Sequence, residues 1–295
     1  EVTLEANPDD ITPALATDLR SAGATRLSLG AQTFDDALLK LLSRRHDSRR
    51  IGEAVRTARA AGFENLSLDL IIGLPRQTLA GCEADLRAAL DLRPDHLSVY
   101  CLIVEPGTPL ERMIAEGDVP APDDDLAADM LQRAIDVLGA AGYERYEISN
   151  WARAEPGRDF RSRHNLKYWL GEPYIGLGAG AHSYYAGRRY GNVARPLEYA
   201  RRLEAGEPAV AVSEPIDREL AMGEALMVGL RLIAGVERTR FRTRFGVDLA
   251  EAFSAQIAEL EALGLVELTP ERLALTERGL FLGNEVFGRF LPKTK

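Results

Sequence analysis

The sequence predicts an α/β protein whose first half is built on a parallel sheet, closed or partly closed. Short apolar runs alternate there with segments of helical period. The strand–helix–strand unit recurs at intervals of about 30 residues, which suits right-handed parallel crossovers. The pattern changes after residue 213, where helices and one hairpin follow one another. A smaller second module is therefore expected at the C-terminal end.

The expected strands of the first half are short, mainly apolar and separated by turn residues. They cover residues 2–6, 26–32, 65–73, 96–103 and 143–149. The strand at 65–73 is nearly all apolar toward its end, as expected of a strand buried on both faces.

Helices are expected between these strands because helical periodicity coincides with capping residues. Asp9 or Asp10 is a candidate N-cap for a helix through Leu19, and Asp47 or Ser48 can cap the helix that ends near residue 62. The other expected helices of this half cover residues 35–43, 79–92 and 124–141. The helices at 47–62 and 79–92 are expected to cover the outside of the sheet.

The second half contains an irregular stretch, residues 150–200, and a module whose element order is typical of a winged helix. Helices are expected from Asp217, at 238–245 and at 249–263, followed by a hairpin around TPER and a last helix from Glu277. We expect two domains, 1–200 and 201–295. From residue 213 onward, 11 Lys and Arg stand against 13 Asp and Glu, a net charge of −2, which disfavours DNA binding by this module.

Composition restricts the possible classes of function. The 295 residues are 46% hydrophobic and 27% charged, as in ordinary globular proteins, and the net charge of −9 argues against non-specific binding of nucleic acid. No run of 18 apolar residues is present, the first residues have neither the basic nor the apolar region expected of a signal peptide, and two cysteines are too few for a disulfide framework. A cytoplasmic protein without a membrane span is expected, and peripheral association with a membrane stays open.

Polar residues stand where three of the predicted strands end or near it. Glu5 closes the first strand, Gln32 closes the second, and Asp69 lies inside the third between hydrophobic residues. Ligands collect at the carboxyl ends of parallel strands, so one shared polar site is expected, to which Arg44 can supply a cation. The alternative for each residue alone is a hydrogen bond to a neighbouring loop.

No metal site is evident in the sequence. Cys82 falls on an amphipathic helix and Cys101 on a strand that looks buried, so both are expected to be buried structural thiols, and neither is a metal ligand. His96 is expected to be structural, and His46 lies among arginines, where a solvated basic face is the simpler interpretation.

HNLKYW, residues 164–169, gathers rare residue types without a clean strand or helix pattern. The chain has only four histidines and two tryptophans, and one of each stands here with Asn165 and Tyr168. One interpretation is a binding site. The other is that His164 and Asn165 cap a turn while Tyr168 and Trp169 fill space between the barrel and the C-terminal module.

Taken in order, nine motifs and a C-terminal stretch resemble one family, the radical S-adenosylmethionine (SAM) proteins related to oxygen-independent coproporphyrinogen III oxidase. Within it, the HNxxYW motif resembles the HemW-type haem chaperone branch more than the oxidases. The matching segments are EANP (5–8), RLSLGAQTF (26–34), LSRRH (42–46), NLSLDLIIGLPRQT (65–78), HLSVY (96–100), EPGTPL (105–110), YEISNWA (146–152), HNLKYW (164–169), YIGLGAGAHS (174–183) and ERLALTERGLFLGNEVF (271–287).

The resemblance implies a partial radical SAM (β/α) barrel that lacks its first strands, followed by a winged-helix-like domain. In the family, a preceding segment carries a CxxxCxxC motif that holds a [4Fe–4S] cluster, and neither this motif nor the glycine-rich GGGTP turn occurs in this chain. We therefore expect no cluster ligands and no radical chemistry in these residues. Whether the chain acts as an enzyme is left open.

The resemblance also implies roles for particular residues. Glu5, Gln32, Arg44 and Asp69 fall on positions that contact SAM in the oxidase relatives. His164 is a candidate axial ligand of haem iron, with Tyr168 and Trp169 as contacts to the macrocycle and His182 as the alternative ligand.

Three functions follow as hypotheses. The first is a haem-binding chaperone that delivers haem to haem proteins, including respiratory ones. The second is an oxidase-type enzyme that acts on a porphyrinogen in porphyrin biosynthesis. The third, from another class, is a winged-helix DNA-binding regulator with an inactive barrel.

Overall fold

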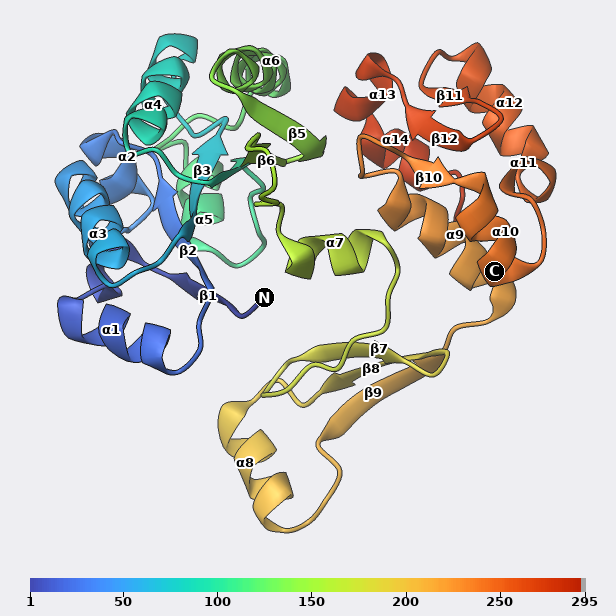
Figure 1. Cartoon of the computed structure of the whole chain (residues 1–295), viewed down its shortest axis with the longest axis horizontal. Helices are drawn as coiled ribbons and strands as arrows, with labels where there is room; N and C mark the ends of the chain where they lie inside the picture. Colours follow the sequence, from blue (N-terminus) through green and yellow to red (C-terminus); the bar gives the residue numbers. More distant parts are fainter. Residues whose placement is uncertain (293–295) are drawn as a thin grey trace. The chain divides into compact units, whose positions relative to one another are not determined.

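The computed structural model describes residues 1–292 and forms two compact units (Figure 1). The first unit is Glu1–His164 and the second begins at Asn165. This division falls inside HNLKYW, earlier in the chain than the expected domain boundary between residues 200 and 201, which stays a prediction.

The first unit contains a six-stranded sheet whose first four strands are parallel, as predicted. Its spatial order is β1-β2-β3-β4-β6-β5. The strands are β1 (Thr3–Ala6), β2 (Arg26–Gln32), β3 (Asn65–Ile72), β4 (His96–Cys101), β5 (Tyr143–Glu147) and β6 (Asn150–Arg153). The last two form a hairpin, and β6 is antiparallel to β4. The sequence predicted a parallel sheet, and the structure differs at this edge, because the tight turn at residues 148–149 can connect only antiparallel strands.

The helices of the first unit lie between the strands in sequence (Figure 1). They are the 3₁₀ helix η1 (Pro8–Asp10), α1 (Pro13–Ser21), α2 (Asp36–Leu41), α3 (Ser48–Ala60), α4 (Leu79–Asp91), α5 (Pro109–Ala115) and α6 (Asp124–Ala140). A buried core joins α3, α4 and α6 to the apolar side chains of β2, β3 and β4. This agrees with the expected covering helices.

Local capping explains where most of these helices begin. Asp47 caps α3 by accepting the amide of Arg50, and Thr78 caps α4 by accepting the amide of Gly81. The predicted cap of the first helix was wrong, because Thr12 caps α1 while Asp9 and Asp10 belong to η1. Pro13 explains the shift, since proline is favoured at the first position of a helix.

The second unit contains two three-stranded antiparallel sheets. One has the order β7-β8-β9 and precedes the other, β10-β12-β11. The strands are β7 (His182–Tyr185), β8 (Arg188–Asn192), β9 (Val210–Pro215), β10 (Val236–Glu237), β11 (Val266–Leu268) and β12 (Arg272–Leu275). Strands β7 and β8 lie in the irregular stretch of residues 150–200, to which no strand could be assigned from the sequence, and β9 follows it.

The C-terminal helices follow the expected order. They are α9 (Arg218–Gly229), α10 (Arg238–Phe245), α11 (Leu249–Ala252), α12 (Ser254–Ala262), α13 (Glu277–Phe281) and α14 (Gly283–Phe287), and α8 (Pro196–Glu204) precedes them. The helix expected at 249–263 is interrupted at Phe253, where the backbone leaves helical geometry. Among residues 1–292, none of the helices has the length and apolar character needed to span a bilayer.

Candidate functional site

The six-stranded sheet has one apolar face and one polar face, because residue character alternates along its strands. Successive side chains of a strand point to opposite faces. The apolar set enters the core and includes Leu27, Leu29, Leu66, Leu68, Leu70, Leu97, Val99 and Trp151. The opposite set is polar and includes Arg26, Ser28, Asn65, Ser67, Asp69, His96, Ser98 and Asn150. The β3 strand is largely buried on both faces, as expected, although its odd-numbered residues from 65 to 69 are polar.

Strand register aligns the polar residues into rows across the sheet. Glu5 lies opposite Ser28, Ser28 opposite Ser67, and Ser67 opposite His96. One step further along the strands, Asp69 lies opposite Ser98. Side chains from four parallel strands thus share one face.

Asp69 is the most constrained carboxylate of this face. Ser28 Oγ donates to both of its oxygens, at 3.0 and 3.1 Å, and Ser67 Oγ lies 3.5 Å from Oδ1. Burial raises the pKa of Asp69 above its ordinary value, and the hydrogen bonds from Ser98 and Ser28 oppose that shift. A carboxylate held in this way is available to a cationic or hydroxyl-bearing ligand.

Gln32 and Arg44 come together at the end of β2. The Nη2 of Arg44 donates to Asn7 Oδ1 at 2.6 Å and to the carbonyl oxygen of Gly30 at 3.2 Å. Gln32 has a φ of 68°, and the register between β2 and β3 shifts between Leu29 and Gln32. A Cβ on Gly30 would lie 2.7 Å from Gln32 Nε2 and 3.1 Å from Arg44 Nη2. The absence of a side chain at Gly30 is what makes room for this pair.

Glu5 lies on the same face as Asp69 and is exposed. Its charge contributes to raising the pKa of Asp69. The four residues predicted from strand ends therefore occupy two places in the first unit: Asp69 and Glu5 on the polar face, and Gln32 with Arg44 at the end of β2.

Three neighbouring polar atoms of this face have unfulfilled hydrogen-bonding capacity. Thr3, Arg26 and Asn65 are register partners on three adjacent strands. Thr3 Oγ1, Arg26 Nε and Asn65 Oδ1 are buried and make no hydrogen bond within residues 1–292. These three residues stand at the amino ends of their strands, and with Glu5 and Asp69 they give the polar face donors, acceptors and both charges, while Gln32 and Arg44 lie at the carboxyl end of β2. These groups fit a ligand that carries an ammonium, a carboxylate and hydroxyls, as SAM does.

The cysteines do not fit an iron–sulfur cluster. Cys82 is buried on α4, as predicted, and burial raises the pKa of its thiol to about 12. Cys101 is exposed at the end of β4, so the prediction of a buried thiol was wrong there, because β4 ends at this residue. In the part of the chain from Glu1 to residue 292, no group of three or more His, Cys, Asp or Glu side chains is placed to hold a metal ion.

Two histidines of the first unit are buried and hydrogen-bonded. His96, expected to be structural, lies between Ser67 Oγ and the hydroxyl of Tyr146, both at 2.8 Å. His46 was expected on a solvated face, but it is only 5% exposed, and its Nε2 lies 3.3 Å from the carbonyl oxygen of Ala31. Burial lowers the pKa of both imidazoles, that of His96 well below its ordinary value.

HNLKYW forms a helix, α7 (Arg163–Trp169), although its sequence has no helical period. The carboxylate of Glu1 accepts the amides of Arg163 at 3.3 Å and His164 at 3.0 Å, which satisfies donors at the start of the helix. Spacings of four residues place His164 and Tyr168 on one side of α7. His164 is therefore the second residue of a helix, and the interpretation in which it caps a turn is wrong.

The aromatic residues of α7 contact other parts of the second unit. The ring of Tyr168 meets Tyr174 edge-on at 4.7 Å. The guanidinium of Arg231 lies 4.5 Å from the centre of the Trp169 ring, and Trp169 Nε1 is buried without a hydrogen bond inside the described residues. His164 itself is exposed.

His182, the alternative haem ligand, begins β7 and is exposed. It pairs across the strands with Gly191, where an added Cβ would lie 3.0 Å from His182 Cε1. The imidazole therefore lies over a residue without a side chain.

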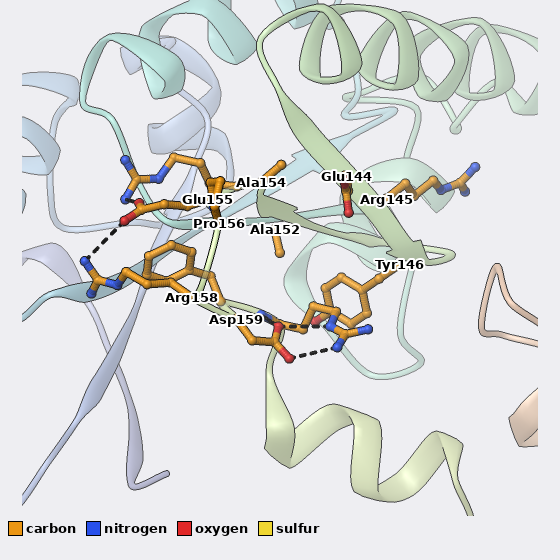
Figure 2. Close-up of a pocket in the computed structure, with 12 residues that line it drawn as sticks. Glu144, Arg145, Tyr146, Ala152, Ala154, Glu155, Pro156, Arg158 and Asp159 are labelled. Atoms are coloured by element: carbon orange, nitrogen blue, oxygen red, sulfur yellow. Dashed lines mark hydrogen bonds and ion pairs between the residues drawn. The ribbon is translucent and has the colours of Figure 1, made fainter.

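A groove of about 560 Å³ lies beside the β5–β6 hairpin, between it and residues 154–161 (Figure 2). Arg158 pairs with Glu155, and Arg161 pairs with Asp159 at 2.8 Å. Tyr146 lies in its wall, close to the segment that leads into α7. This groove could not be predicted from the sequence, because its lining comes from the hairpin and the irregular segment that follows it.

The arginines of α10 are partly engaged within the second unit. Arg238 and Arg242 pair with the buried carboxylate of Asp248. Arg240 donates to the carbonyl oxygen of Leu170 at 3.2 Å. Arg240, Arg242 and Arg244 are nevertheless exposed, so α10 keeps a mostly solvated basic face.

Comparisons with known proteins agree on one family. Residues 1–89 match the Radical SAM superfamily, and residues 216–282 match the HemN C-terminal domain. The chain is 40% identical over 292 residues to the heme chaperone HemW of Bacillus subtilis (strain 168), covering 99% of this chain and 76% of that protein. It is 33% identical over 300 residues to the heme chaperone HemW of Escherichia coli (strain K12), covering 99% of this chain and 75% of that protein.

A solved structure shares the fold. The chain resembles the structure of coproporphyrinogen III oxidase (HemN) from Escherichia coli, described as a radical SAM enzyme, with a TM-score of 0.83 and 24% sequence identity. The likeness covers 98% of this chain and 69% of that one. The α/β radical SAM fold predicted from the sequence is thus confirmed, together with a HemN-type C-terminal domain.

Proposed function

The chain belongs to the HemW family of haem chaperones within the radical SAM superfamily, and from this membership we propose that it binds haem and delivers it to haem proteins. The observation that carries the proposal is the 40% identity to a heme chaperone over 99% of the chain. The expected acceptors include respiratory haem proteins. We keep the cytoplasm as the expected location.

For haem binding, we propose His164 as the axial ligand of the iron. An imidazole is a common haem ligand, and the side chain of His164 is exposed on a short helix that also carries Tyr168 and Trp169. His182 is the alternative, since it is exposed as well. Tyr168 and Trp169 supply aromatic surface to the macrocycle.

The test is a titration of the protein with ferric haem, followed through the Soret band. We expect saturable binding that weakens at least about tenfold in His164→Ala, the loss of one coordinate bond being worth more than 1.4 kcal/mol. Lys167→Ala is the matched control on the same helix and should bind as the unaltered protein does. Unchanged binding in His164→Ala with loss in His182→Ala would transfer the ligand role to His182.

We further propose that Glu5, Gln32, Arg44 and Asp69 contact SAM. Membership of the superfamily implies SAM and a [4Fe–4S] cluster as cofactors of the family. The support is the mixed set of charges and donors on the polar face and at the end of β2. If bound, SAM would supply a positively charged sulfonium together with the ammonium, carboxylate and hydroxyl groups that these four residues would hold. The described residues do not fit the cluster, so no step is assigned through it.

The remaining parts of the sequence prediction stay proposals. We propose a partial barrel in residues 1–200 and a winged-helix-like domain in residues 201–295. The oxidase alternative is tested by assaying coproporphyrinogen conversion with SAM and a reductant. The DNA-binding alternative has less support, because Arg238 and Arg242 already bind Asp248.

A further inference from the structure

Tyr146 contacts two parts of the first unit through a single hydroxyl group. It stands on β5, and its oxygen lies 2.8 Å from Nε2 of His96. The same oxygen accepts the backbone amide of Ser162 at 3.1 Å. All three residues are buried, so each polar group here needs a partner inside the protein.

Counting protons gives this chain of hydrogen bonds a direction. His96 is completely buried, and burial lowers the pKa of its imidazole, so the ring is neutral and carries one proton. The Tyr146 oxygen accepts from Ser162, and its own proton has His96 Nε2 as acceptor among the described residues. The imidazole proton therefore lies on Nδ1, which donates to Ser67 Oγ at 2.8 Å.

The chain of hydrogen bonds ends beside Asp69. Because Ser67 Oγ accepts the proton of His96, the Ser67 hydroxyl donates its own proton to another acceptor. That acceptor is Asp69 Oδ1, at 3.5 Å. Every donor from Ser162 onward thus points toward the polar face. Hydrogen bonds aligned in this way polarise and strengthen one another.

The other end of the chain of hydrogen bonds is the start of the HNLKYW helix. Ser162 directly precedes α7, and the next two amides, of Arg163 and His164, are accepted by the carboxylate of Glu1. Three consecutive amides are therefore held by side chains from other parts of the unit. Of these, only the Ser162 amide is joined to the polar face of the sheet.

We propose that Tyr146 is a positioning residue that ties the start of the HNLKYW helix to His96 and, through His96 and Ser67, to the face that carries Asp69. The consequence for haem affinity rests on the proposed function, because it assumes that HNLKYW binds haem. The hydrogen-bond link itself does not depend on that assumption.

The test compares Tyr146→Phe with Tyr143→Phe in the full chain. Tyr143 is a matched control, since it is a buried tyrosine of the same strand whose hydroxyl donates to the carbonyl oxygen of Pro94. Tyr146→Phe should speed hydrogen exchange of the Ser162 amide about fivefold and weaken binding of ferric haem about fivefold, equivalent to about 1 kcal/mol for one buried hydrogen bond. Tyr143→Phe should change neither.

A second readout reports on His96 directly. Nitrogen-15 NMR of the imidazole should show the Nδ1–H tautomer in the unaltered protein and a mixture of tautomers in Tyr146→Phe, which a general loosening of the fold would not produce. If His96 carries its proton on Nε2 in the unaltered protein, the assigned direction is wrong and the proposal fails.

Ser67→Ala tests the link from the other end and leaves Tyr146 in place. It should also shift the His96 tautomer and weaken haem binding, by a smaller factor. Unchanged tautomer and haem affinity would show that the link does not reach the sheet. If His164→Ala leaves haem binding intact while Tyr146→Phe still accelerates Ser162 exchange, the haem role of HNLKYW fails but the link stands.

Discussion

Gly30→Ala is the substitution that tests the end of β2 most directly. The added Cβ would lie 2.7 Å from Gln32 Nε2 and 3.1 Å from Arg44 Nη2, and the first distance is shorter than side-chain contacts tolerate. Both neighbours are ends of flexible side chains, so they move and the backbone stays. The expected structural effect is displacement of Arg44 from the carbonyl oxygen of Gly30, to which it donates at 3.2 Å.

The magnitude follows from two opposing contributions. Loss of a hydrogen bond from a charged group costs about 1.5–3 kcal/mol. Replacing glycine by alanine where the backbone allows it stabilises the folded protein by about 0.4–1 kcal/mol, because it reduces the conformational entropy of the unfolded chain. The free energy of unfolding should therefore fall by about 0.5–2.5 kcal/mol. Binding of SAM should weaken at least about tenfold, because Gln32 and Arg44 shift together.

Urea unfolding measures the stability, and isothermal titration with SAM measures the binding. Gly139→Ala is the control, since an added Cβ there meets nothing within 4 Å and the residue lies in the last turn of α6. That variant should gain about 0.5–1 kcal/mol, the ordinary preference of a helix for alanine. If Gly30→Ala is stabilised like the control and binds SAM with unchanged affinity, the inference that Gly30 makes room for Gln32 and Arg44 at the SAM site is wrong.

Three further predictions concern other parts of the chain. Asp69→Asn should raise the free energy of unfolding at pH 7 by about 1 kcal/mol. Because burial raises the pKa of Asp69 in the folded protein, the carboxyl contributes stability below its unfolded pKa of 3.8, and this contribution is lost as the pH rises through the folded pKa. The gain from Asn should therefore vanish when urea unfolding is measured in acid. Iodoacetamide at pH 8 should label exposed Cys101 in the folded protein but Cys82 only after unfolding, as mass spectrometry would show, and early labelling of Cys82 would contradict its burial. Gly279→Ala should lower the free energy of unfolding, measured in urea, by about 3 kcal/mol. The added Cβ would lie 1.9 Å from the carbonyl oxygen of Leu265, a backbone atom that cannot move away as a side chain can. A loss below about 1 kcal/mol would contradict this.

Much of the first unit could be predicted from the sequence because its signals are local. Asp47 and Thr78 stand directly before helices, and the β2, β3 and β4 strands have apolar residues at every second position. The α7 helix could not be predicted in this way. Two of its first amides are satisfied by Glu1, more than 160 residues away in the sequence, and such a contact leaves no local pattern.

The residues of the candidate site also fall into two groups, those that could be predicted from the sequence and those that could not. Glu5, Gln32 and Asp69 could be selected because parallel strands end at a common edge, a rule that needs only the order of elements. The places of Tyr146 and His96 depend on the antiparallel return of β6 along β4, which the sequence did not indicate. The alternation of polar and apolar residues in HLSVY was the available signal that His96 and Ser98 lie on the face opposite the apolar core.

The alternation along β3 also determines how this protein can tolerate changes of length. Residues that pack in the core alternate along β3 with residues of the polar face, so Leu66, Leu68 and Leu70 each lie next to a polar residue in the sequence. Deletion of one residue within the strand would move leucines to the polar face and Asp69 into the core. Insertions and deletions in β3 should therefore be far more damaging than substitutions, and a library that varies only the odd positions 65, 67 and 69 could change the chemistry of the face while leaving the packing of the helices intact.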